Sequence, residues 1–329
     1  MFCHFDFDEV PMKKYAFLFP GQGAQEPGMM KDVCESFPES RKLLDSVSSI
    51  TGRDMAKLLW ETDQAELSRS DNSQLAITSA SLMISEVLKS KGIVPSAAMG
   101  FSLGEFPALG ISGVLSFEDL IRVVQKRGDI MQRVCEEIAS ANAGHAPGMS
   151  AIIGLPPEKV QEICSGLSDV YAANLNSVKQ TVISGTADGL AAAEKACTEA
   201  GARRAIRLSV AGPFHCPLMQ KAADEFEKAI ADVSFADPKI DLFSNVTGEK
   251  VLKGSDAKKN AVLHLTNPVR WTLEEKVLAD VMDADSENEW RVLEPGVGKV
   301  LSGLWRDSPF GEKRPSTPVN SAESIGGVE

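Results

Sequence analysis

The stretch GFSLGEF, residues 100–106, contains the serine best placed to act as a nucleophile. It fits the pattern G-x-S-x-G, in which small flanking residues let a strand turn sharply into a helix and expose the serine hydroxyl. The start of the following helix would add oriented N–H groups and a partial positive charge. Serine between glycines also occurs in ordinary turns, so this pattern alone leaves open whether Ser102 is catalytic.

A serine hydroxyl needs a general base at neutral pH, and the sequence has four histidines. His4 lies near the start of the sequence, His145 in a loop with Gly and Pro, and His264 near the end of a predicted helix. His215 lies in AGPFHCPLM, a loop whose Gly and Pro residues could aim a side chain at the Ser102 turn. We therefore favour His215 as the base.

An arginine on a predicted helix is the third candidate. Residues 116–140 begin with SFED, a helix-capping pattern, and carry an apolar face made of Phe117, Leu120, Ile121, Val124 and Met131. At 100° per residue Arg127 falls beside Leu120 at the edge of this face, whereas the other basic side chains point away. An arginine in that position needs an anion, which a structural carboxylate or a substrate could supply.

The elements that must hold these residues can be read from the apolar pattern. Residues 14–19, KYAFLF, indicate a buried strand that ends in the turn PGQG, a candidate backbone anion site. Residues 72–89 are apolar almost all round and precede Gly92, which predicts a buried helix with a glycine C-cap. A short strand at 97–99 should lead into the Ser102 turn. The segments IDLFSN and WRVLEPG predict further strands.

Residues 149–210 alternate in the order βαββαβ, the ferredoxin-like arrangement. We expect a small ferredoxin-like domain at 146–210 inserted into a large α/β domain at 13–145 and 211–310. The large domain should contain a short parallel sheet with the serine at the carboxyl end of a strand, and the small domain should form the other wall of the cleft. Residues 1–12 and 311–329 are expected to be terminal extensions. The second of these is rich in Pro, Ser, Gly and charge and should be a mobile tail.

Composition excludes several classes of function. The chain has 329 residues, is 43% hydrophobic and lacks any run of 18 apolar residues, so a membrane span is not expected. A net charge of −12 argues against nucleic-acid binding. The six cysteines form no CxxC pair, which argues against a zinc site and a disulfide framework and favours a reducing cytoplasm. The first dozen residues lack the basic start and apolar segment of a secretion signal.

Eight blocks in order resemble the malonyl-CoA:acyl carrier protein transacylases. They run from about residue 14 to residue 304, and such an ordered series is far more specific than one G-x-S-x-G. The blocks are FLFPGQGAQ, GFSLGEFPALGISGVLSFED, QKRGDIMQ, GMSAIIGL, NLNSVKQTVISG, AGPFHCPLM, NPVRW and LEPGVGKVLSGL.

The resemblance implies a role for each matching residue. Ser102 would carry the malonyl group, with His215 as its general base and acid. The backbone N–H groups of Gln22 and Leu103 would form the oxyanion hole, and Arg127 would pair with the free carboxylate of the malonyl group. Other matching positions would bind substrate or orient the base: Phe214, which resembles the malonyl-selecting versions of its loop, Asn174 and Asn176 of the N-x-N pattern, and His264, whose backbone carbonyl would orient His215.

Two positions depart from the family pattern. Many members carry His where this sequence has Phe101, which could change the packing behind the serine. Members often carry Gln at the position of His264; the carbonyl role survives this change, but a side-chain role is in doubt. For Asn174 and Asn176, ordinary turn or strand-end hydrogen bonding is an equal alternative.

The resemblance implies malonyl transfer from malonyl-CoA to the phosphopantetheine thiol of acyl carrier protein for fatty-acid synthesis. CoA and phosphopantetheine take part as substrates, and no metal or other cofactor is expected. The partner would be an acidic carrier protein, with Arg203, Arg204, Lys258 and Lys259 as weak candidates for its contact, and we expect a cytoplasmic monomer. Alternatives are a stand-alone acyltransferase of a polyketide synthase or malonate decarboxylase system, and a serine thioesterase, which would use water and lack the arginine. A non-enzymatic CoA-binding or scaffold module would have lost the serine, histidine or arginine, and all three are present.

Overall fold

The computed structural model describes residues 12–142 and 144–328. It contains a parallel sheet in the order β7-β2-β1-β8-β9 and an antiparallel sheet in the order β4-β5-β3-β6, in agreement with the predicted α/β class. The strands of the parallel sheet are β1 (Lys13–Phe19), β2 (Pro95–Gly100), β7 (Asp241–Leu242), β8 (Glu289–Pro295) and β9 (Ser316–Val319). The predicted N-terminal extension, apart from Met12, lies outside the described residues.

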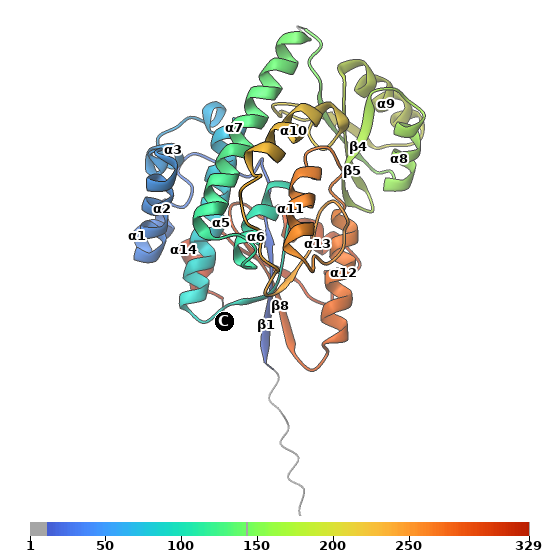
Figure 1. The fold of residues 1–329 in the computed structure, drawn as a ribbon. Coiled ribbons are helices and arrows are strands. Elements are labelled where there is room, and N and C mark those ends of the chain that lie inside the picture. Colours follow the sequence, from blue (N-terminus) through green and yellow to red (C-terminus); the bar gives the residue numbers. More distant parts are fainter. Residues whose placement is uncertain (1–11, 143, 329) are drawn as a thin grey trace, which may run out of the picture.

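Helices lie on both sides of the parallel sheet (Figure 1). Those that precede the small sheet in the sequence are α1 (Lys31–Ser36), α2 (Pro38–Thr51), α3 (Met55–Trp60), α4 (Gln64–Leu67), α5 (Ser70–Ser90), α6 (Glu105–Ile111) and α7 (Phe117–Ala141). Those that follow it are α10 (Gln220–Ala229), α11 (Gly254–Leu263), α12 (Trp271–Ala284), α13 (Val300–Asp307) and α14 (Ala322–Gly326). Two short 3-10 helices are η1 (Ser102–Gly104) and η2 (Pro217–Met219).

Strand β1 shows why the sheet is covered on both faces. Phe17 and Phe19 join one apolar core with α5 and α7, while Ala16 and Leu18 join another with α12 and α13. Successive side chains of a strand point to opposite faces, so a continuous apolar run fits a strand buried on both sides. Helix α5 is likewise buried almost all round, as its sequence predicts, and Gly92 follows it with φ of 80°.

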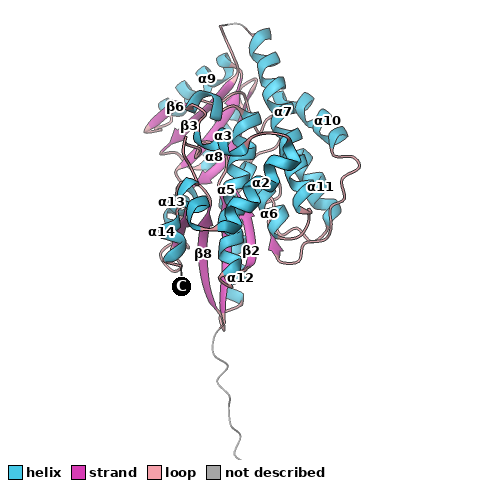
Figure 2. Ribbon diagram, turned by 90° about the vertical axis from the view of Figure 1, so that its left-hand side faces the viewer, coloured by secondary structure: helices cyan, strands magenta, loops and turns pink. Residues whose placement is uncertain are grey.

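The small sheet and its two helices follow the predicted βαββαβ order, and they lie at the upper left of Figure 2. They are β3 (Gly148–Ile153), α8 (Pro157–Ser165), β4 (Val170–Ser177), β5 (Gln180–Gly185), α9 (Ala187–Glu199) and β6 (Arg204–Arg207). These elements have an apolar core of their own. Backbone hydrogen bonds between β4 and Val269 attach this sheet to the segment before α12.

The expectation of a mobile tail at 311–329 is wrong. Residues 316–319 form β9, which pairs in parallel with β8, and Val319 and Ile325 are completely buried. A short polar strand that contains Pro318 is difficult to identify from sequence, because proline and hydroxyl residues are also typical of loops. Among the described helices, none is long and apolar enough to cross a membrane.

Candidate active site

The serine turn lies at the carboxyl end of β2, where Ser102 is the first residue of η1 and α6 follows directly. Ser102 has φ of 52°, a left-handed conformation that is strained for a residue with a side chain. Its glycine neighbours are pressed against backbone: a Cβ atom at Gly100 would collide with Gly104, and one at Gly104 would collide with Phe19. The two glycines therefore permit the sharp turn, which agrees with the interpretation of G-x-S-x-G.

His215 lies opposite this turn. Its Nε2 atom is 2.8 Å from Ser102 Oγ, and its Nδ1 atom is 2.9 Å from the backbone oxygen of His264. A carbonyl oxygen can only accept, so Nδ1 carries the proton and Nε2 presents a lone pair to the serine hydroxyl. The three residues therefore form the arrangement that a general base requires, with a backbone carbonyl in the orienting position.

The His215 side chain is buried and its backbone φ is 59°. The loop that holds it follows β6 and passes so close to α7 that a side chain at Gly212 would collide with Cys135. Burial lowers the pKa of His215 to about 4, and the charge of Arg127 acts in the same direction, whereas the hydrogen bond to His264 O opposes them. The imidazole is therefore neutral at pH 7 and able to accept a proton.

Arg127 is the side chain that the helical wheel placed at the edge of the apolar face, and it is 1% exposed. Its Nη1 donates to Gln74 Oε1 at 2.7 Å, and its guanidinium lies 4.9 Å from the centre of the Phe106 ring. Nε has no hydrogen-bond partner, and the ion pairs of the described residues do not include Arg127. Burial lowers its pKa to about 9, and the charge of the buried Glu105 acts in the opposite direction. The hydrogen-bond partners of this buried cation are neutral.

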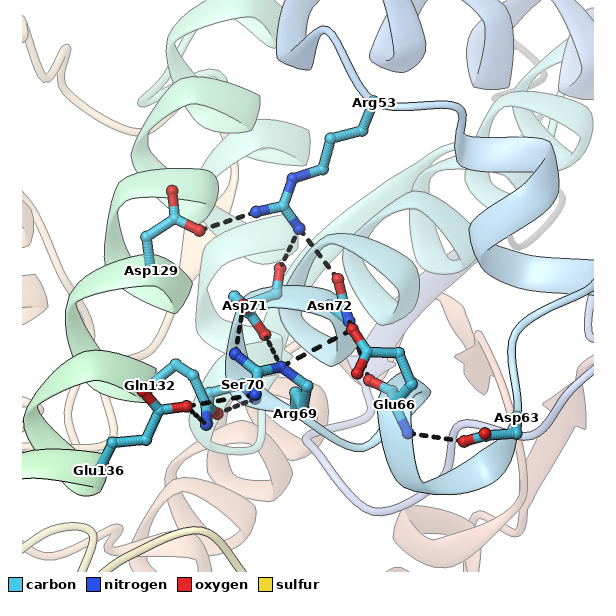
Figure 3. Close-up of polar contacts among 10 residues, drawn as sticks. All are labelled: Arg53, Asp63, Glu66, Arg69, Ser70, Asp71, Asn72, Asp129, Gln132 and Glu136. Carbon is cyan, nitrogen blue, oxygen red and sulfur yellow. Dashed lines mark hydrogen bonds and ion pairs between the residues drawn. The ribbon is translucent and has the colours of Figure 1, made fainter. Parts of the chain in front are cut away.

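The contact between α5 and α7 sets the relative position of Gln74 and Arg127. At Gly128 an added Cβ would lie 2.9 Å from Ser70 O, so the two helices nearly touch beside Arg127. A cluster of polar residues connects α7 with the start of α5 and the segments before it (Figure 3). Arg53 joins Asp129 at 2.9 Å, and Gln132 Oε1 accepts from Ser70 N at 2.8 Å. The cluster consists of Arg53, Asp63, Glu66, Arg69, Ser70, Asp71, Asn72, Asp129, Gln132 and Glu136.

The two predicted oxyanion-hole residues lie on either side of a close backbone contact. Leu103 belongs to η1, and Gln22 belongs to the PGQG turn after β1. A Cβ at Gly21 would lie 2.6 Å from Phe101 O, and Phe101 N donates to Phe19 O at 2.9 Å. The turn after β1 is thus packed against the serine turn. The Gln22 side chain donates to Ser73 Oγ at 2.8 Å.

The remaining predicted positions are less closely connected to the serine. Phe214 is buried in the large core directly before the base, and Phe101 packs edge-to-face on Trp271 with ring centres 5.5 Å apart. Asn174 and Asn176 are buried on β4, and Asn176 Oδ1 has no hydrogen-bond partner. The hydrogen bonds of the described residues do not connect these asparagines with Ser102, His215 or Arg127.

Sequence reasoning missed Asn245. Its Oδ1 accepts from Ser102 N at 2.7 Å, and its Nδ2 donates to Gly100 O at 2.6 Å and to Glu274 Oε1 at 2.9 Å. It lies just after the two-residue strand β7, in FSNVTG, where an asparagine would normally indicate a turn. The side-chain contacts of Gln74 and His264 with Arg127 were also missed, because neither residue type nor spacing signals them.

Comparison with known proteins gives one consistent result. The family model described as "Acyl transferase domain" matches residues 16–285. The malonyl CoA-acyl carrier protein transacylase of Bacillus subtilis is 37% identical over 297 residues, covering 89% of this chain and 90% of that one. An acyl carrier protein S-malonyltransferase from Vibrio cholerae superposes with a TM-score of 0.86 at 34% identity, covering 96% of this chain and all of the other. A malonyl-transacylase solved in complex with its holo type II PKS acyl-carrier protein superposes with a TM-score of 0.84 at 32% identity, covering 95% of this chain and 97% of the other.

Proposed function

The chain belongs to the malonyl CoA-acyl carrier protein transacylase family, and from this premise we propose how its residues carry out the reaction. The enzyme transfers the malonyl group from malonyl-CoA to acyl carrier protein. The observation that supports our assignment best is the arrangement of Ser102 Oγ, the His215 ring and the His264 carbonyl, with Arg127 buried and outside the ion pairs of the described residues.

In the first half-reaction Ser102 Oγ attacks the thioester carbonyl carbon while its proton moves to His215 Nε2. The resulting oxyanion is stabilised by the N–H groups of Leu103 and Gln22. When the intermediate collapses, the carbon–sulfur bond breaks and the CoA sulfur takes the proton from Nε2. A malonyl ester of Ser102 and neutral His215 remain.

In the second half-reaction the phosphopantetheine thiol of the carrier protein gives its proton to His215 and attacks the ester. The carbon–oxygen bond breaks, and Ser102 recovers its proton from Nε2. Every bond change is an acyl or proton transfer between these groups, so the proposed cycle uses no metal or redox cofactor. Arg127 pairs with the free carboxylate of the malonyl group in both halves.

The finer assignments are also proposals. Phe214, Asn174 and Asn176 would border the bound acyl group. The large domain would consist of residues 13–145 and 211–310, with a small domain at 146–210 inserted into it. Arg203 and Arg204 are exposed on the small sheet and would face an acidic carrier protein, whereas Lys258 donates to the backbone oxygens of Ala231 and Val233. We further propose a cytoplasmic monomer that serves fatty-acid synthesis, which fits the free thiols of the described cysteines.

Intact mass spectrometry after mixing with malonyl-CoA or acetyl-CoA tests the function. Malonyl should label the enzyme, and the label should be absent in Ser102→Ala. Arg127→Ala should reduce malonyl labelling and leave acetyl labelling unchanged or increased. Equal labelling of the wild type by both thioesters would contradict the role of Arg127.

Discharge of the malonyl-enzyme separates transfer from hydrolysis. Holo acyl carrier protein should remove the malonyl group much faster than water does, and the malonyl-carrier thioester should accumulate. If water removed it as fast, the thioesterase alternative would be correct. Comparison of fatty-acid and polyketide carrier proteins would identify the pathway.

A further inference from the structure

The amide of Asn245 has a defined orientation in the core behind the serine. Ser102 N can only donate and Gly100 O can only accept, so Oδ1 must face the first at 2.7 Å and Nδ2 the second at 2.6 Å. Nδ2 also donates to Glu274 Oε1, and the Asn245 backbone N–H donates to Glu105 Oε2 at 2.9 Å. These contacts leave no freedom for the amide to flip.

This orientation determines the tautomer of His264. Its Nε2 atom lies 3.0 Å from Asn245 Oδ1, and because that oxygen carries no hydrogen, Nε2 must be the protonated nitrogen. Nδ1 is therefore an acceptor, and it faces Arg127 Nη2 at 3.4 Å. The ring is completely buried, and burial together with the charge of Arg127 keeps its pKa well below the usual value.

We propose that the His264 imidazole is a positioning residue that holds Arg127 for the substrate carboxylate, with Asn245 fixing its tautomer. This role rests on the proposed function and is separate from that of the His264 backbone carbonyl, which orients His215. The positioning role of the imidazole makes the side chain at position 264 a determinant of the preference for acyl groups with a free carboxylate.

The hydrogen-bond partners of Arg127 explain why a neutral His264 ring is suited to position the guanidinium. Gln74 Oε1 and His264 Nδ1 each accept from one terminal nitrogen of the guanidinium, and neither carries charge. A carboxylate in either place would neutralise Arg127 and compete with the substrate. Neutral acceptors orient the guanidinium and leave its charge for the malonyl group.

Two variants at position 264 isolate the side chain, because both keep the backbone carbonyl. In His264→Gln the amide can donate to Asn245 and accept from Arg127, whereas in His264→Leu it can do neither. We expect His264→Leu to lower kcat/KM for malonyl-CoA about tenfold more than kcat/KM for acetyl-CoA, mainly through KM. His264→Gln should retain the malonyl preference to within about threefold.

The same measurements can overturn the inference. If His264→Leu lowers the rates for malonyl-CoA and acetyl-CoA equally, the ring acts only through packing around the His215-orienting carbonyl. If it leaves both unchanged, the ring does not position Arg127. Failure of the wild type to form a malonyl ester at Ser102 would instead refute the proposed function, so the two failures are distinguishable.

Nitrogen-15 spectra of histidine-labelled enzyme give a readout independent of activity, with His264→Gln identifying the resonances. We expect His264 to be neutral at pH 7 with its proton on Nε2. A proton on Nδ1, or a charged ring at that pH, would contradict the proposed contact with Arg127.

Discussion

Ser102 and His215 approach to 2.8 Å, and each has a left-handed backbone, with φ of 52° and 59°. Both halves of the proposed catalytic pair therefore occupy a conformation that L-residues with a side chain rarely adopt. Surrounding contacts hold these conformations: the Ser102 N–H is bound by Asn245, and the His215 ring is bound by the His264 carbonyl. Strain of this kind persists where the rest of the fold determines the backbone.

The strain at Ser102 predicts a difference between two inactive variants. Ser102→Gly and Ser102→Ala both remove the hydroxyl, but only glycine adopts φ of 52° without steric cost. We expect Ser102→Gly to be more stable than Ser102→Ala, with an unfolding free energy that urea titrations show to be about 1 kcal/mol higher. Neither variant should form an acyl-enzyme. Equal stability would mean that the serine turn relaxes when the hydroxyl is removed.

The low pKa of His215 predicts activity in acid. Because its pKa is lowered to about 4, Nε2 stays unprotonated as the pH falls through the ordinary histidine range. We expect kcat/KM for malonyl-CoA to stay level between about pH 7 and 5.5 and to fall only near or below about pH 5. Arg127→Gln removes a charge that lowers this pKa, so its acid limb should shift to higher pH. A wild-type limb near pH 6.5 would contradict the burial of the base.

The sequence predicts the parts of this site whose signal is local. Apolar runs locate β1 and α5, the Gly pair locates the turn around Ser102, and helical periodicity singles out Arg127. Asn245 carries no such signal, because its partners Ser102 and Glu274 are 143 and 29 residues away in the sequence. The role of the His264 ring depends on the same long-range packing. Strand β9 was missed because its polar, proline-containing sequence becomes a strand only by pairing with β8.

Glu275 is a buried carboxyl whose titration should affect stability. It accepts from Trp271 Nε1 at 2.9 Å, and burial raises its pKa to about 8. The unfolded group titrates near its ordinary value of 4.5. Its contribution to stability is thus complete below that pH and is lost as the pH rises toward 8.

Glu275→Gln keeps the acceptor and removes the ionisation. At pH 4 its unfolding free energy should be close to that of the wild type, and at pH 8.5 it should be higher by about 4 kcal/mol, as urea titrations at the two pH values would measure. The exposed Glu287→Gln makes the same change of charge and should show no such pH dependence. If the difference in unfolding free energy between Glu275→Gln and the wild type were the same at both pH values, Glu275 would ionise freely in the folded state.

The carboxyl-terminal segment should be part of the folding unit. Ile325 of α14 is completely buried in the same core as β1 and α5, and Asn320 Nδ2 donates to Gly298 O at 2.8 Å. Replacing a buried isoleucine by alanine removes apolar contacts and leaves a cavity, so Ile325→Ala should lower the unfolding free energy by about 2 to 4 kcal/mol. The exposed neighbour Glu323→Ala should change it by less than about 0.5 kcal/mol. Thermal and urea unfolding that show no difference between the two variants would mean that α14 does not pack on the core in solution.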